Sequence, residues 1–517
     1  MDIHRCVSHD KICFEKIVPP FSSFDYVEKH FGSIEALRRI FSLGRSFNAQ
    51  TLIIENISSQ GILDEEDKEI KELYPDYIKG ELKRISFWLK PIDSINQLNR
   101  YNNKVLAGYA IIKRDIVPSQ KMDRWHIFES VFKKYPHPHN CVPFPGIYNI
   151  MIGNKKFQIP GLLYCQQNQL NKACAQVALR SLLSRLLPQK DISYKAINQI
   201  ARKVSVPGWK PKNGLDVPQI RKVLDEFNLK YRDIDYSQSL ELKKDIPYQK
   251  MAYSGLESGG GSLVGFRLSG KGLQEESRHI IPFYGHTFNK DTWAPDADVA
   301  YFHIGEDFGY IPSETWTSSY LGHDDNFGPN FCIPRLYIEQ EKVEYVVEIF
   351  RPGVQFGGVQ TEVLGLKFLY SIIPKMNPSK NIWLKRLINW TQKQRIVLRA
   401  IALEKEEYVR HLQKLRDWQE HAEDKDFSKI FLKYLPSHIW MIEISTPQLF
   451  PANQRKLGEI VLDATKSFKK DFKDFDVFLF ARLPGEYLLG NKLDNTGSPV
   501  FQSLPSNLNS HTPLGCF

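Results

Sequence analysis

A run from Gln166 to Pro188, QQNQLNKACAQVALRSLLSRLLP, constrains this chain more than any other stretch, because it places a cysteine where an apolar helix begins. Apolar residues then recur with the period of a helix, which Pro188 ends. Arg180 and Arg185 lie off this stripe and are expected to face water. In the first turn, Cys174 would meet unpaired backbone N–H groups and the positive end of the helix dipole, which favour a thiolate. The stretch is typical of a cysteine nucleophile, although a small buried residue that simply starts a core helix gives the same pattern.

Composition sets broad limits. A chain of 517 residues is too long for one hydrophobic core, and usual domain sizes suggest about three domains. Apolar and charged contents of 42% and 25% are those of an ordinary globular protein. The excess of 69 Lys and Arg over 59 Asp and Glu is small for this length, so it permits an acidic partner without requiring one.

The location is predicted from three further features. No apolar run approaches the roughly 18 residues that a membrane span needs. The N-terminal residues MDIHRCVSHDKICFEK lack the apolar core of a signal peptide. The 7 cysteines show neither disulfide-like nor zinc-like spacing, which predicts reduced thiols. We therefore expect a soluble cytoplasmic protein with no membrane attachment.

The chain divides into regions of different pattern. Residues 1–155 are predicted to form an α/β N-terminal accessory domain, residues 156–374 a central domain, residues 375–495 a helical plus β C-terminal accessory domain, and residues 496–517 a flexible tail. In the central region, two helices follow Pro188 before a series of strands begins near Leu263. That order indicates an α+β fold with antiparallel strands rather than a wound parallel sheet.

The C-terminal region carries a long polar–apolar stretch from Asn381 to His421, which is expected to be a helix or a helix pair. Strands are expected over 439–445 and 476–483, with a helix between Pro451 and Phe472. Basic and aromatic residues together can bind nucleic acid, but packing of an amphipathic helix on the core is favoured here. The tryptophans of the long stretch are Trp383, Trp390 and Trp418.

The segment YPHPHNC offers a candidate metal site, because His137, His139 and Cys141 lie close together in the sequence. Alternate residues of this kind can bind a metal, but no second pair of ligands lies nearby in the sequence. An exposed loop is favoured, and neither a metal nor another cofactor is predicted.

The order of polar residues after the first stretch points to nucleophilic catalysis. A cysteine nucleophile needs a base, a group that orients the base and a donor for the oxyanion. His279 opens the strand HIIPFYGH downstream of Cys174, and Asp324 with Asp325 follows in HDDNFGP. Two alternatives remain open: Asp325 in place of Asp324, and His286 with Asp291 in place of His279. The two aspartates fit a capped loop or, with Asn326 and the acids near Glu306, a cation site as well.

These segments resemble the papain-like cysteine peptidase superfamily, most closely bacteriocin-processing peptidase domains and related bacterial proteins. QQNQLNKACAQVALRSLL resembles their nucleophile helix, HIIPFYGH their histidine strand and HDDNFGP the strand end that supplies the third residue. GLDVPQIRKVLDEFNL, from Gly214, is similar to the helix that follows the nucleophile helix. The resemblance covers about residues 157–350. It implies a nucleophile helix packed on an antiparallel sheet, and a triad of Cys174, His279 and Asp324.

The sequence departs from the family in the register of the oxyanion glutamine. The usual position falls on Asn168, and the glutamines lie at 166, 167 and 169. We take Gln167 as the donor, with a one-residue bulge, and leave Gln166 as the alternative. Pro282 interrupts the histidine strand, which argues for an edge position there. The segment between His279 and Asp324 is long enough to form a lid or a substrate wall.

The expected function is thiol-dependent hydrolysis of peptide or isopeptide bonds by a cytoplasmic cysteine peptidase. Its partner would be a protein or peptide substrate, with a regulatory protein as a further partner. Two alternatives use the same scaffold. One is a non-catalytic module whose basic tryptophan-containing region binds nucleic acid or protein, and the other is an acyl transferase or deamidase with the same triad.

Overall fold

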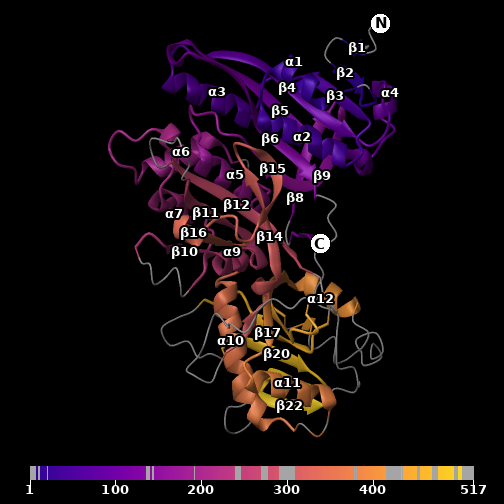
Figure 1. Ribbon diagram of the computed structural model, residues 1–517, viewed down its shortest axis with the longest axis vertical. Coiled ribbons are helices and arrows are strands. Elements are labelled where there is room, and N and C mark those ends of the chain that lie inside the picture. Colours follow the sequence, from indigo (N-terminus) through magenta and orange to yellow (C-terminus); the bar gives the residue numbers. More distant parts are fainter. Residues whose placement is uncertain are drawn as a thin grey trace.

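The fold is mixed α+β, with helices packed on antiparallel sheets, as the order of elements predicts. The computed structural model describes residues 7–9, 12–19, 21–134, 140–142, 145–190, 192–238, 246–268, 277–289, 309–377, 379, 381–414, 432–433, 435–450, 455–467, 476–493 and 499–503. Three regions, each built on one sheet, follow one another along the long axis of the molecule (Figure 1).

The first sheet is entirely antiparallel and has the order β1-β2-β3-β4-β5-β6-β9-β8. It ends with Tyr164, beyond the predicted domain boundary at residue 155. Its strands are β1 (Val7–His9), β2 (Ile12–Lys16), β3 (Thr51–Asn56), β4 (Ile78–Trp88), β5 (Leu106–Val117), β6 (Met122–Lys133), β8 (Gly146–Ile152) and β9 (Lys155–Tyr164). The helices of this region are α1 (Ser23–Phe31), α2 (Glu35–Ser46), α3 (Ile62–Leu73) and α4 (Ile95–Leu98).

The central sheet has the order β10-β16-β11-β12-β14-β15, and β7 also pairs with β12. Helices α5, α6 and α7 share one apolar core with it, and α9 belongs to a second core. The strands are β7 (Asn140–Cys141), β10 (Tyr231–Asp235), β11 (Gly259–Leu268), β12 (Ser277–Phe288), β14 (Thr317–Asp324), β15 (Gly328–Pro334) and β16 (Val343–Phe350). The helices are α5 (Cys174–Leu186), α6 (Tyr194–Arg202), α7 (Val217–Glu226) and α9 (Tyr248–Glu257).

Helix α5 lies between the first and central sheets, because it packs on β8 and β9 of one and on β11 and β12 of the other. The prediction that Arg180 and Arg185 face water is wrong for this reason. Both side chains are buried. Arg180 donates to Glu129 Oε2 at 2.9 Å, and Arg185 donates to the Gly260 carbonyl. A buried guanidinium is tolerated where oxygen atoms such as these accept hydrogen bonds from its N–H groups.

The third sheet has the order β13-β17-β18-β19-β20-β21-β22. Its strands are β13 (Ile311–Pro312), β17 (Val397–Glu404), β18 (His438–Ser445), β19 (Gly458–Asp463), β20 (Phe478–Leu483), β21 (Glu486–Leu493) and β22 (Pro499–Ser503). Helices α10 (Gly358–Ile372), α11 (Ile382–Gln392) and α12 (Lys405–Lys414) complete the region. Strands β18 and β20 lie where strands were predicted.

Three predictions for this region are wrong. The stretch from Asn381 is not continuously helical, because β17 lies between α11 and α12. Strand β19 lies where a helix was expected, and β22 pairs with β21 inside the predicted flexible tail. The packing interpretation of the tryptophans is supported, since Trp383 and Trp390 are partly buried against the apolar core of this region. Trp418 lies outside the described residues.

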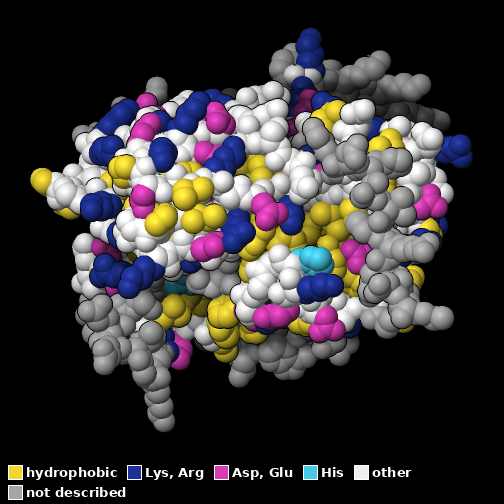
Figure 2. Space-filling model, turned by 90° about the horizontal axis from the view of Figure 1, so that it is seen from above, with side chains coloured by type: hydrophobic (Ala, Val, Ile, Leu, Met, Phe, Trp, Pro, Cys, Tyr) yellow, Lys and Arg dark blue, Asp and Glu magenta, His cyan; other side chains and the backbone are white. Residues whose placement is uncertain are grey.

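The distribution of charged side chains on the surface is consistent with the modest net charge of +10. On the face formed by the N-terminal end, Lys and Arg side chains are interspersed with Asp and Glu (Figure 2). Within the described segments, helices that combine the length and the apolar character of a membrane span are absent.

The expectation of reduced thiols is wrong for two cysteines. Cys13 and Cys141 both take part in disulfide bonds. Cys165, Cys174 and Cys332 are free. The first of these is buried, the second is half-buried and the third is exposed.

Candidate active site

Cys174 is the first residue of α5, as the sequence predicts. The helix begins after Ala173, whose extended backbone N–H donates to Gln176 Oε1 at 3.2 Å. Gln176 also donates to the carbonyl of Pro211 at 2.8 Å and is itself fully buried. The start of α5 is thus fixed by Gln176, while the Cys174 side chain remains half-buried at the surface of the core.

His279 is positioned by β12, an interior strand whose neighbours are β11 and β14. Register with β14 begins only at Phe283, so the segment that carries His279 and Pro282 is paired with β11 alone. The predicted edge position is therefore local: Pro282 lies where the strand has one partner, which a residue without N–H tolerates. The His279 ring is buried and meets Phe266 edge-on.

The structure brings Cys174, His279 and Asp324 together. Nε2 of His279 lies 3.2 Å from Asp324 Oδ2. Burial by itself would lower the pKa of the imidazole, but hydrogen bonds with Asp324 and Cys174 and the charge of Asp325 raise it to about 10. Because Asp324 engages Nε2, Nδ1 is the nitrogen left for the Cys174 sulfur. The charged imidazolium is the form that this site favours.

The two aspartates have different environments. Burial opposes ionisation of Asp324, but the pKa of its carboxyl is lowered by His279 and by the backbone N–H groups of Asn326 and Phe327, which donate to Oδ1 at 2.9 and 3.2 Å. Asp325 is buried, and neither of its carboxylate oxygens has a hydrogen-bond partner among the described residues. Burial raises its pKa to about 7. Asp324 is the ionised partner of His279, while Asp325 Oδ1 lies 3.5 Å from the same nitrogen.

The two glutamines point to different places. Gln167 Nε2 donates to Asn326 Oδ1 at 2.8 Å, so its amide lies beside the turn that follows Asp324. Gln166 Oε1 accepts from the backbone N–H of Ile127 at 3.0 Å, which ties it to β6. Gln169, the third glutamine, has a left-handed backbone with φ 59°. Gln167 is therefore the glutamine that contacts the turn following Asp324.

His286, the alternative base, belongs to a different cluster. It is fully buried, and its Nε2 lies 2.8 Å from Glu257 Oε1. Burial lowers its pKa, so the neutral ring is favoured. Glu257 in turn accepts from Arg399 of β17 at 3.0 Å, which links the central sheet to the third sheet. Asp291, its proposed orienter, lies outside the described residues, as do Glu306, His137 and His139.

A candidate metal site coincides with the histidine and aspartate group. Ligand atoms of His279, Asp324 and Asp325 all lie within 4.8 Å of one another. Imidazole and carboxylate are ligands that zinc accepts. A cation there would take Nε2 of His279, the nitrogen that Asp324 now holds, so it would replace the contact that orients the ring.

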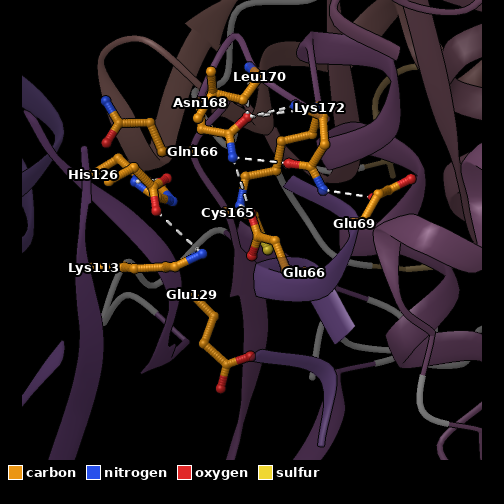
Figure 3. Close-up of polar contacts among 12 residues, drawn as sticks. Glu66, Glu69, Lys113, His126, Glu129, Cys165, Gln166, Asn168, Leu170 and Lys172 are labelled. Atoms are coloured by element: carbon orange, nitrogen blue, oxygen red, sulfur yellow. Dashed lines mark hydrogen bonds and ion pairs between the residues drawn. The ribbon is translucent and has the colours of Figure 1, made fainter. Parts of the chain in front are cut away.

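Sequence reasoning missed a set of buried polar residues that surround the loop before Cys174. They include Asn168 and Lys172 of the loop and Glu66 and Glu69 of α3 (Figure 3). Asn171 of the loop is buried as well. The signal available in the sequence was the polar run NQLNK directly before an apolar helix. A buried polar loop requires partners, but these lie about a hundred positions upstream, where no local pattern marks them.

Asp325 gives a testable dependence of stability on pH. Its pKa is about 7 in the folded protein against an ordinary 3.8, so the folded state holds this proton more tightly than the unfolded chain. The stability that it contributes is full below about pH 4 and is lost as the pH rises to 7. Asp325→Asn removes this loss. The free energy of unfolding of the variant should therefore exceed that of the wild type by up to about 4 kcal/mol at pH 8 and equal it at pH 4.

The measurement is the free energy of unfolding in urea at pH 4, 6 and 8. Asp93→Asn serves as the control, because Asp93 is exposed. Its free energy of unfolding, plotted against pH, should run parallel to that of the wild type. Parallel curves for Asp325→Asn would contradict the assignment of a raised pKa to this carboxyl.

Comparison of the chain with protein-family models, with curated proteins and with solved structures finds no match.

Proposed function

We propose that the protein is a thiol-dependent hydrolase with a papain-like core, which cleaves peptide or isopeptide bonds. Cys174 is the nucleophile, His279 the acid and base, Asp324 the orienting carboxylate and Gln167 an oxyanion donor. The observation that carries the proposal is the hydrogen-bonded connection from Cys174 through His279 to Asp324, with the imidazole pKa raised to about 10. A buried histidine between a thiol and a carboxylate is the arrangement that activates a cysteine.

In the proposed mechanism the Cys174 thiolate attacks the carbonyl carbon of the substrate and forms a C–S bond. The carbonyl oxygen becomes an oxyanion, and the Gln167 amide and the Cys174 backbone N–H donate hydrogen bonds to it. One amide hydrogen of Gln167 is used by Asn326, and the second is available for this purpose. His279 then gives its proton to the leaving nitrogen as the C–N bond breaks, which leaves a thioester.

Water completes the cycle. His279, now neutral, takes a proton from water as the oxygen attacks the thioester carbonyl. The C–S bond breaks, the acid product departs, and the thiolate and imidazolium are restored. An amine in place of water would give acyl transfer, and a glutamine amide as substrate would give deamidation. The products identify which of the three reactions occurs.

The cellular location remains part of the proposal. A cytoplasmic protein was expected from the sequence, but the disulfide bonds of Cys13 and Cys141 are more common in oxidising compartments. Alkylation of the protein at the moment of cell lysis, followed by mass spectrometry of these two cysteines, distinguishes the two locations.

The test of the proposed function uses a peptidyl acyloxymethyl ketone, whose reaction requires an activated thiolate and develops an oxyanion. We expect one adduct, on Cys174, that forms at least about 100 times faster than adducts on Cys165 or Cys332. Cys174→Ala should abolish it. Equal and slow labelling of all free cysteines would refute the proposal and favour a non-catalytic scaffold.

A further inference from the structure

The loop from Asn168 to Lys172, which joins Gln167 to the nucleophile helix, is polar yet buried. Asn168, Asn171 and Lys172 are all fully inaccessible to solvent. Asn168 Oδ1 accepts the backbone N–H groups of Leu170, Asn171 and Lys172 at 3.0, 3.2 and 3.3 Å. One side chain therefore holds the loop in a single compact turn.

Helix α3 of the first region holds this turn from outside. Glu66 Oε1 accepts from Asn168 Nδ2 at 3.0 Å and from Lys172 Nζ at 2.8 Å. Glu69 Oε2 accepts from Asn171 Nδ2 at 2.7 Å. Residues three apart lie on one face of a helix, so both carboxylates meet the loop together (Figure 3).

The same contacts extend to helix α6. Glu69 Oε1 accepts from Asn198 Nδ2 of α6 at 3.0 Å, and Asn198 also donates to the Asn171 carbonyl at 2.7 Å. The Lys172 ammonium lies over the Tyr194 ring, 4.4 Å from its centroid. Hydrogen bonds between charged and amide groups in a dry interior have few alternative arrangements, so the loop has little freedom to shift.

We propose that Glu66 and Glu69 are positioning residues for the hydrolysis proposed above, on which this inference rests. They fix the loop whose two ends carry Gln167 and Cys174, and so they set the position of the oxyanion donor relative to the sulfur. The N-terminal region is on this view part of the active site and not a detachable accessory domain. A displacement of about 1 Å in such a group costs roughly 100-fold in rate.

The experiment compares two reagents at Cys174 in the full-length chain. Iodoacetamide needs only the thiolate, whereas the peptidyl acyloxymethyl ketone also needs the oxyanion donor. We expect Glu66→Gln and Glu69→Gln to lower the ratio of the ketone rate to the iodoacetamide rate at least about 10-fold. Gln167→Ala gives the ratio for complete loss of the donor. Glu72→Gln is the matched control on the same helix, since Glu72 is exposed and pairs with Lys195 on the surface.

A second variant separates positioning from stability. Glu66→Gln leaves the buried Lys172 charge uncompensated and is expected to destabilise the fold. Glu66→Gln/Lys172→Met removes both charges, so its Tm should return towards that of the wild type while the rate ratio stays low. A ratio that recovers together with the Tm would overturn the positioning role.

The remaining outcomes distinguish the two proposals. If the ketone fails to label Cys174 preferentially in the wild type, the proposed function fails and the positioning role fails with it. If the wild type reacts through Cys174 but the ratios of Glu66→Gln and Glu69→Gln equal that of Glu72→Gln, only the positioning role is refuted.

Discussion

His279→Ala is expected to lower the rate at which Cys174 reacts with a peptidyl acyloxymethyl ketone by about 10⁴-fold, and to lower hydrolysis of any amide substrate at least as much. The loss has two physical causes. The imidazolium that stabilises the thiolate disappears, and so does the group that protonates the leaving nitrogen. The labelling rate at pH 7, with the adduct mapped by mass spectrometry, measures the effect.

His286→Gln is the matched control, because it alters a buried histidine on the same strand. Its side chain contacts Glu257 and is absent from the Cys174 cluster, so the labelling rate should stay within a few-fold of the wild type while the Tm falls. A larger loss of rate for His286→Gln than for His279→Ala would transfer the role of base to His286. Asp324→Asn should give an intermediate loss, since the ring keeps its place but loses its ionised partner.

Arg399→Met is expected to cost about 3–5 kcal/mol of stability, the second large effect. Arg399 is buried and donates to Glu257 at 3.0 and 3.1 Å and to Glu443 at 3.5 Å. Methionine keeps the apolar stem but leaves Glu257 as a buried carboxylate without its guanidinium. Burial by itself raises the pKa of Glu257, and Arg399 is the first of the groups that lower it to about 2.

Unfolding in guanidinium chloride followed by fluorescence measures this cost. Lys342→Met provides the control, because Lys342 forms an exposed pair with Glu339 and should change stability by less than about 0.5 kcal/mol. A loss for Arg399→Met no larger than that of the control would show that the contact between the central and third sheets does not depend on this ion pair.

Some elements could be predicted because their signal is local. The period and the terminating proline of the stretch from Gln166 correctly gave α5. Strand β17 could not be predicted, because the run IVLRAIALE is apolar on both faces apart from Arg399 and the final Glu404, and such a run fits a buried helix as well as a buried strand. The same ambiguity between helix and strand explains why a helix was predicted where β19 lies.

The burial of Arg180 shows a limit of a different kind. The helical period places this residue on the polar side of an amphipathic helix, which would face water if α5 covered one sheet. The chain instead places a second sheet against that side, and Glu129 of β6 supplies the acceptor. Periodicity describes which residues share a face of a helix, but not what lies against each face.

The sequence by itself determined the order and the local setting of the candidate site: a cysteine at a helix start, a histidine on a strand and an aspartate at a strand end. Tertiary structure decided which of the competing residues meet. It placed Asp324 rather than Asp325 in a hydrogen bond with His279, put Gln167 against the turn after Asp324, and enclosed His286 in a separate cluster. It also brought Glu66 and Glu69 to the loop before Cys174, because hydrogen bonds and desolvation depend on distances in space that no spacing along the chain encodes.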